Sequence, residues 1–220
     1  LAPTAAELLP GGGVRLSAPG RKPVTAGVPS SGRTIVVDLF GTKVAAVPAE
    51  DDAVHAWCTA LLGTAVRLVH LDDPATRRPV DPRFALPGET VSFADGFPLL
   101  LTTTASLDAL NSLIAGGRYA DEGPLPMNRF RPNVVVAGTA AWEEETWTRV
   151  TIGEAVFRVA KPCARCVVTT TDQETSRRGK EPLHARAARQ RPRGALLFGQ
   201  NLVPLTPGTT IRVGDRVEAG

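Results

Sequence analysis

The sequence is poor in cysteine, in aromatic residues and in long apolar runs. Three cysteines in 220 residues cannot form a disulfide framework, and such a sparse, odd set is typical of a reducing compartment such as the cytoplasm. Aromatic residues make up only 5% of the chain, and none interrupts the arginine-rich stretch near the carboxy terminus, so nucleic acid has no stacking platform. The longest apolar runs are far shorter than the ~20 residues of a membrane span. We therefore expect a cytoplasmic protein that binds neither nucleic acid nor membranes.

Glycine and proline, at 21 and 19 residues, divide the chain into short β-branched runs. This pattern is typical of β-barrels and sandwiches. Two helices are expected, one capped by Asp51 and closed by Gly63, with Cys58 on its apolar face in the core, and one over residues 106–114. The predicted fold class is mainly β with a few helices (α+β). The expected strands are 34–38, 43–47, 65–70, 134–137, 154–159, 167–170, 201–205, 209–212 and 215–218.

A connector rich in proline and arginine, residues 72–87, predicts two domains, residues 1–84 and residues 85–220. In the second domain, residues 134–136 are three consecutive valines, which predicts a strand buried on both faces. This strand follows directly after Arg129-Phe130-Arg131-Pro132-Asn133. Polar residues at the mouth of a buried strand can form a ligand site.

Two of the three cysteines lie in Cys163-Ala164-Arg165-Cys166. This spacing fits half of a zinc site, a dithiol redox pair, or one functional thiol with a bystander, and two buried structural cysteines are a further reading. No second close Cys or His pair completes a zinc site, and a redox dithiol should open a helix, whereas residues 167–171 are β-branched and predict a strand. We favour a single functional thiol, Cys166, because the adjacent Arg165 favours ionised sulfur.

Three segments, in this order along the chain, resemble the MOSC family: Phe93-Ala94-Asp95-Gly96-Phe97-Pro98, Arg129-Phe130-Arg131-Pro132-Asn133 and Cys163-Ala164-Arg165-Cys166. Residues 180–183, 197–201 and 207–215 extend the resemblance. In particular, the chain resembles the bacterial relatives of the mitochondrial amidoxime reducing component. This implies a MOSC-type β-barrel core preceded by an amino-terminal β-barrel domain. That first domain is expected to be truncated, since the family's Tyr-Pro-Val-Lys-Ser and Asp-Arg elements, which contact the cofactor phosphate, are absent.

The resemblance also implies a cofactor and a set of site residues. The cofactor is the molybdenum cofactor (Mo-molybdopterin), and Cys166 matches the metal-ligating, catalytic cysteine of the family. Arg131, Asn133 and Arg165 match positions that hold the pterin and its phosphate. Ala94, Asp95 and Gly96 match a segment that contacts the pterin ring, and Ala164 stands where the mitochondrial enzymes have serine.

The implied activity is the reduction of small N-hydroxylated compounds, namely amidoximes, hydroxylamines and N-hydroxylated bases. No nucleotide-binding glycine motif or iron–sulfur motif occurs in the chain, so a separate electron-transfer partner, a ferredoxin-type protein or a flavin reductase, is implied. One alternative is a cofactor-handling or sulfur-carrier module, as in molybdenum cofactor sulfurases, and another is a degenerate barrel that binds no cofactor. A basic cluster is interpreted as a docking surface or as the mouth of the substrate site. Its members are Arg177, Arg178, Lys180, Arg186, Arg189, Arg191 and Arg193.

Overall fold

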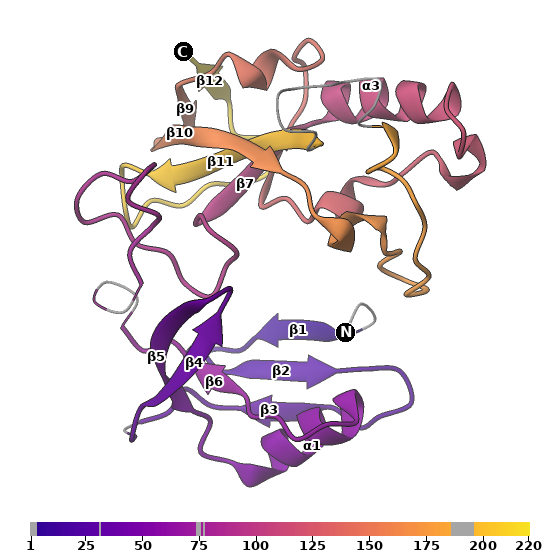
Figure 1. Ribbon diagram of the computed structural model, residues 1–220. Helices are drawn as coiled ribbons and strands as arrows, with labels where there is room; N and C mark the ends of the chain where they lie inside the picture. Colours follow the sequence, from indigo (N-terminus) through magenta and orange to yellow (C-terminus); the bar gives the residue numbers. More distant parts are fainter. Residues whose placement is uncertain (1–3, 31, 74–75, 77, 186–195) are drawn as a thin grey trace. The chain divides into compact units, whose positions relative to one another are not determined.

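The computed structural model describes residues 4–30, 32–73, 76, 78–185 and 196–220 (Figure 1). The chain divides into two compact units. The first comprises Leu1–Pro79, Thr90–Phe93 and Glu174–Ser176, and the second comprises Val80–Glu89, Ala94–Gln173 and Arg177–Gly220. The domain boundary expected between residues 84 and 85 stays a prediction, because the two units exchange short stretches on either side of it. In the described parts of the chain, no helix has the length and apolar character needed to cross a membrane.

In its described residues, the first unit has two antiparallel three-stranded sheets and the helix α1. The helix α1, Asp52–Leu62, is confirmed: the Asp51 side chain accepts a hydrogen bond from the amide of Ala53, and Gly63 ends the helix at φ 68°. Cys58 is half-buried on this helix rather than in the core. The strands are β1 (Ala5–Leu8), β2 (Val14–Ser17), β3 (Val24–Ala26), β4 (Ile35–Leu39), β5 (Thr42–Pro48) and β6 (Val69–His70).

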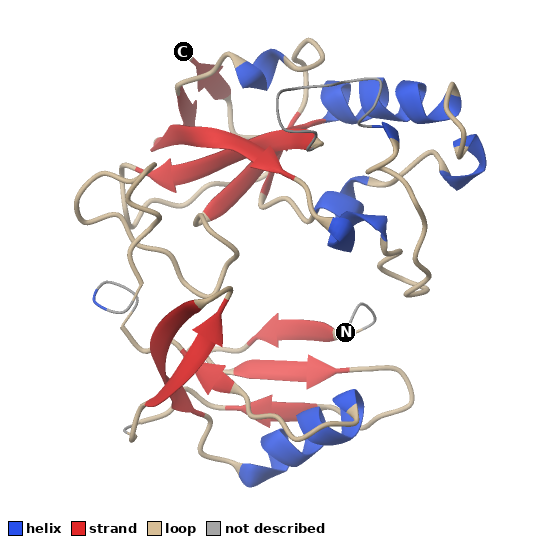
Figure 2. Cartoon of the chain, viewed as in Figure 1, coloured by secondary structure: helices blue, strands red, loops and turns tan. Residues whose placement is uncertain are grey.

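The second unit is built on a six-stranded, barrel-like sheet with the order β12-β9-β10-β11-β7-β8. All neighbouring strands pair antiparallel except β7 and β8, which run parallel. Figure 2 shows that strands and loops predominate, so the predicted fold class, mainly β with a few helices, is confirmed. The strands are β7 (Leu99–Thr103), β8 (Val134–Val136), β9 (Arg149–Ile152), β10 (Ala155–Ala164), β11 (Leu197–Pro204) and β12 (Val217–Ala219).

Two apolar clusters hold this unit together. One lies on the sheet and includes Leu101, Val150, Phe157 and Leu202. The other joins the helix α3 (Thr104–Ala115) to Leu125, Phe130, Leu196 and Phe198. Burying such side chains contributes ~1.5–3 kcal/mol each. The helix starts two residues earlier than expected, because the hydroxyl of Thr103 accepts a hydrogen bond from the amide of Ser106 and caps it.

Four strand expectations are corrected by the structure. Residues 167–170 form a 3₁₀ helix, η4 (Val167–Thr170), because the hydroxyls of Thr169 and Thr170 donate hydrogen bonds to carbonyls three residues back and stabilise the turn. Residues 209–212 are irregular, and the strand expected over residues 65–70 is reduced to β6. The strand β8 is buried on one face only, since Val135 is 46% exposed.

Candidate functional site

Cys163 lies near the end of β10, where the side chain of Arg165 fixes the chain. The Nη1 atom of Arg165 donates to Cys163 Sγ at 2.9 Å, and Nη2 donates to the carbonyl oxygen of Phe130 at 2.7 Å. The guanidinium carbon lies 5.8 Å from the centroid of the Phe130 ring, and the amide of Arg165 donates to the carbonyl of Leu196. One arginine thereby joins β10, the segment before β11 and the Phe130 turn. The thiol that the Arg165 guanidinium contacts is that of Cys163, whereas the sequence analysis favoured Cys166.

Cys166 begins the next turn and is exposed, whereas Cys163 is half-buried. It occupies the amino-terminal cap position of η4, and its carbonyl accepts the Thr169 hydroxyl at 2.8 Å. The backbone around this thiol is therefore fixed while the residue itself stays open to solvent. This combination suits a thiolate that contacts a ligand or a metal from outside the protein.

The Arg131 segment lies beside this turn, because the 3₁₀ helix η2 (Met127–Phe130) packs against η4. Arg131 follows η2 in a left-handed conformation, at φ 51° and ψ 49°, and is exposed. Asn133 is also exposed, but its amide and its Oδ1 atom both pair with the backbone of Leu100 at 2.9 Å. Asn133 thus extends the parallel β7–β8 pairing and positions the Arg131 turn.

The Asp95 segment is joined to β10 by the contact of Phe97 with Lys161, a residue that sequence reasoning missed. Asp95 is exposed, Ala94 is half-buried, and a Cβ atom added at Gly96 would meet nothing within 4 Å, so this backbone is open to a ligand. The Lys161 ammonium lies 5.4 Å from the Phe97 ring centroid and 4.4 Å from that of Phe84. The only sequence signal was a lysine two residues before Cys163, beyond the end of the strand predicted over residues 154–159.

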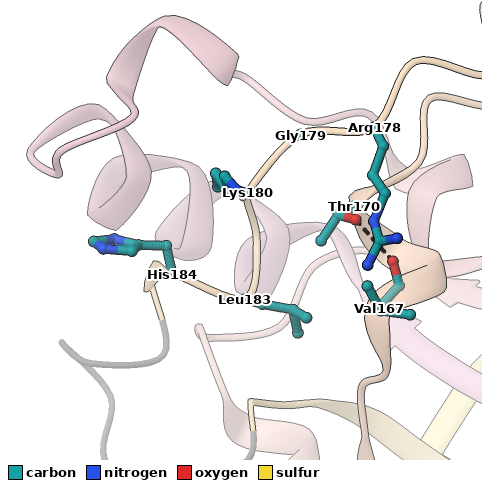
Figure 3. Close-up of a pocket in the computed structure, with 7 residues that line it drawn as sticks. All are labelled: Val167, Thr170, Arg178, Gly179, Lys180, Leu183 and His184. Atoms are coloured by element: carbon teal, nitrogen blue, oxygen red, sulfur yellow. Dashed lines mark hydrogen bonds between the residues drawn. The ribbon is translucent and has the colours of Figure 1, made fainter.

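A pocket of about 750 Å³ opens next to the Cys166 turn (Figure 3). Its lining starts at Val167, the residue that follows Cys166, and continues over Thr170 to a loop that carries two basic side chains. The remaining lining residues are Arg178, Gly179, Lys180, Leu183 and His184. The pocket therefore combines cationic, apolar and hydroxyl groups within reach of the exposed cysteine's turn.

Backbone hydrogen bonds hold the loop in place. Arg178 pairs with Thr171 in an antiparallel bridge, and the Gly179 amide donates to the carbonyl of Thr170 at 2.9 Å. The Glu122 carboxylate accepts the amides of Lys180 and Glu181, each at 2.8 Å. The same carboxylate explains why residue 179 is glycine, since a Cβ there would lie 2.3 Å from Glu122 Oε2.

Comparisons with known proteins show the family of this chain. Residues 88–218 match the model of the MOSC domain. The chain belongs to the MOSC family. It is 34% identical over 167 residues to mitochondrial amidoxime reducing component 2 of Rattus norvegicus, covering 73% of this chain and 47% of that protein. It is 32% identical over 179 residues to mitochondrial amidoxime-reducing component 1 of Homo sapiens, covering 76% and 50%.

A relative with another name matches equally well. The chain is 31% identical over 172 residues to molybdenum cofactor sulfurase of Oryza sativa subsp. japonica, covering 74% of this chain but 21% of that protein. This MOSC chain thus spans about half the length of the amidoxime reducing relatives and about a fifth of the sulfurase.

The charges around Cys166 suit the anionic cofactor that the MOSC resemblance implies. Arg129, Arg131 and Arg165 lie at or beside η2 and η4, and Arg129 is paired with Asp172 at 3.0 Å. Within the described residues, the buried Nε atoms of Arg129 and Arg165 have no hydrogen-bond partner. An excess of guanidinium groups beside an exposed soft thiol fits a phosphate-bearing ligand with a sulfur-ligated metal.

Proposed function

We propose that this MOSC protein is a molybdenum cofactor-binding oxidoreductase that reduces small N-hydroxylated compounds. The observation that carries the proposal is an exposed cysteine, Cys166, whose neighbour Val167 lines a pocket of about 750 Å³ within the MOSC-matching residues. The amidoxime reducing names of the relatives from Rattus norvegicus and Homo sapiens support the reaction class.

The chain's own residues would hold and orient the cofactor. A bound Mo-molybdopterin would supply a two-electron redox centre. Cys166 would give one thiolate ligand to the metal. The exposed guanidinium of Arg131, next to the anchored Arg165, would contact the phosphate. Ala94, Asp95 and Gly96 would border the pterin ring, where the Asp95 carboxylate can accept ring N–H donors. Ala164 and Asn133 would shape the backbone on either side of the bound cofactor.

The reaction needs electrons and protons from outside the chain. Reducing an amidoxime to an amidine consumes two electrons and two protons, breaks the N–O bond and releases one water. We propose that a separate electron-transfer protein, of ferredoxin type or a flavin reductase, delivers the electrons in the cytoplasm. The exposed Arg177, Arg178 and Lys180 belong to the basic cluster that we interpreted as a docking surface or a substrate mouth. The other members, Arg186, Arg189, Arg191 and Arg193, lie outside the described residues.

A second candidate function is a cofactor-handling or sulfur-carrier module, as in molybdenum cofactor sulfurases. The similarity to the Oryza sativa sulfurase favours it, and so does the exposure of Cys166, since a carrier thiol must be reached by a donor and an acceptor. In this reading, Cys166 would carry a persulfide without a stably bound metal.

Metal and pterin analysis separates the two functions. The protein is purified from a host that makes the molybdenum cofactor, in wild-type form, as Cys166→Ala and as the matched control Cys163→Ala. Near-stoichiometric molybdenum in the wild type and the control, lost in Cys166→Ala, together with benzamidoxime reduction by a chemical reductant, is the expected result. A persulfide on Cys166 without metal would favour the carrier, and absence of both pterin and persulfide would contradict both functions.

A further inference from the structure

We propose that the pocket beside Cys166 binds an oxyanion group of the substrate, a carboxylate or a phosphate, through Arg178 and Lys180. This inference rests on the proposed reductase function and deepens it, because it names the class of substrate. The preferred substrate would carry its N-hydroxyl group at one end, an anionic group at the other end, and a small apolar group between the two.

The charges of the pocket carry the argument. Arg178 and Lys180 are exposed, line the pocket, and have no ion-pair partner among the residues that the structure describes. The nearby carboxylates are engaged elsewhere: Glu122 accepts backbone amides, and Asp172 is paired with Arg129. Glu181 is fully buried: its Oε2 atom accepts the amide of Ala185, and its Oε1 atom lies 3.8 Å from Nδ1 of His184. The exposed charged side chains that line the pocket are therefore both positive.

The loop is already fixed in the conformation that presents these cations. The bridge between Arg178 and Thr171 and the amide of Gly179 tie the loop to η4, and Glu122 fixes the amide of Lys180. Figure 3 shows the Arg178 side chain on the η4 side of the pocket and Lys180 farther along the loop. Because the backbone is ordered before binding, a ligand would have to order only the two side-chain ends.

The size and the apolar groups of the pocket limit what else the substrate contains. A volume of about 750 Å³ lies within the range of small-molecule sites, ~300–1,000 Å³. Val167 and Leu183 contribute apolar surface, and His184 is held edge-on to the ring of Tyr119 at 4.7 Å between centroids. These features suit a substituted aryl group, with its oxyanion on the loop and its N–OH group toward the Cys166 turn.

The test compares a charged and a neutral substrate of the same shape. The ratio of kcat/KM for 4-carboxybenzamidoxime to that for benzamidoxime is measured with a chemical reductant on wild-type protein, on the double variant Arg178→Gln/Lys180→Gln, and on Arg149→Gln. Arg149 is an exposed arginine of β9 and serves as the matched control. We expect the wild type and the control to prefer the carboxylate by about fivefold, and the double variant to lose that preference, as for an ion pair in a solvent-open site.

A binding measurement makes the result independent of turnover. Calorimetry with 4-carboxybenzamidoxime, without reductant, should show an affinity about fivefold lower in the double variant than in the wild type, and lower at high salt. Turnover of benzamidoxime with a ratio near one in every protein would overturn this inference and leave the reductase function intact. Absence of any turnover would instead contradict the reductase function. Loss of pterin from the double variant would show that the cations hold the cofactor's phosphate, which would overturn the assignment to substrate.

Discussion

The residues before and after Cys166 differ in how their polar groups are used. Before it, β10 and Arg165 form an anchored segment, residues 155–165, in which the guanidinium contacts Cys163 and Phe130. After it, the pocket loop, residues 177–184, is tied down by its backbone but leaves the side chains of Arg178 and Lys180 exposed. The Arg165 side chain of the anchored segment therefore contacts other protein groups, whereas the two cationic side chains of the pocket loop are accessible to a ligand.

This difference explains how one thiol can be both fixed and reachable. A ligand site loses affinity when its groups must be ordered on binding, so the backbone has to be rigid beforehand. Arg165 supplies that rigidity on one side of Cys166, and Glu122 supplies it on the other. Changes in the anchored segment should therefore cost stability, whereas changes in the side chains of the pocket loop should cost binding.

The largest effect is expected from Phe130→Ala. Phe130 is fully buried, lies 4.0 Å from the Phe198 ring centroid, and its carbonyl accepts the Arg165 guanidinium. Truncation should lower the free energy of unfolding by ~3–5 kcal/mol, because it removes apolar burial and leaves a cavity. Urea unfolding followed by tryptophan fluorescence measures this change. Phe40→Ala, at a residue 77% exposed, is the control and should stay within ~0.5 kcal/mol of wild type. Equal losses in both variants would contradict the role of Phe130 in supporting the anchored segment.

The next effect is expected from Gly179→Ala, which breaks the backbone support of the pocket loop. The new Cβ would lie 2.3 Å from Glu122 Oε2 and displace a carboxylate that accepts two amides. Leaving such donors unsatisfied should cost ~1–3 kcal/mol. Hydrogen exchange at Lys180 and Glu181 should accelerate in the same variant. Gly27→Ala is the control, since its Cβ would meet nothing within 4 Å. Equally accelerated exchange at Lys180 and Glu181 in the Gly27→Ala variant would refute the support of the pocket loop by Glu122.

The features of the fold and of the candidate site that depend on local sequence patterns could be predicted from the sequence. The Asp51 cap, the Gly63 end of α1 and the exposed cysteine of a close pair follow from neighbouring residues. The cation–π contact of Lys161 with Phe84 and Phe97 joins segments far apart in the chain, and no local pattern encodes such a contact. The turn at residues 167–170 was wrongly predicted as a strand, because β propensity was outweighed by threonine hydroxyls that bond to the backbone.

Thiol labelling compares the two sides of Cys166 directly. Cys166 is exposed, Cys163 is half-buried under the Arg165 contact, and burial raises the pKa of the Cys58 thiol above its ordinary value. Iodoacetamide should therefore modify Cys166 at least ~10-fold faster than Cys58 near neutral pH, because the thiolate is the reactive form. Cys58 should catch up only as the pH rises beyond the ordinary thiol range. Peptide mass spectrometry over time follows all three sites, with Cys166→Ser as control, and faster labelling of Cys58 would contradict the assigned exposures.

The smallest effect concerns Asp81, which lies at the surface beside the anchored segment. Hydrogen bonds from the Arg83 side chain, then from its backbone amide, lower the pKa of Asp81 to about 2, with a smaller contribution from the charge of Lys161. Because the folded pKa lies below the unfolded value of about 4, the contribution to stability is present above pH ~4 and is lost as the pH falls through about 2. An NMR titration of the Asp81 carboxyl should show this low midpoint, rising toward the ordinary value in high salt since the pair is exposed. Arg83→Gln should raise the midpoint more than Lys161→Gln does. The reverse order would mean that the cation held between Phe84 and Phe97, rather than the surface arginine, sets the charge on this side of β10.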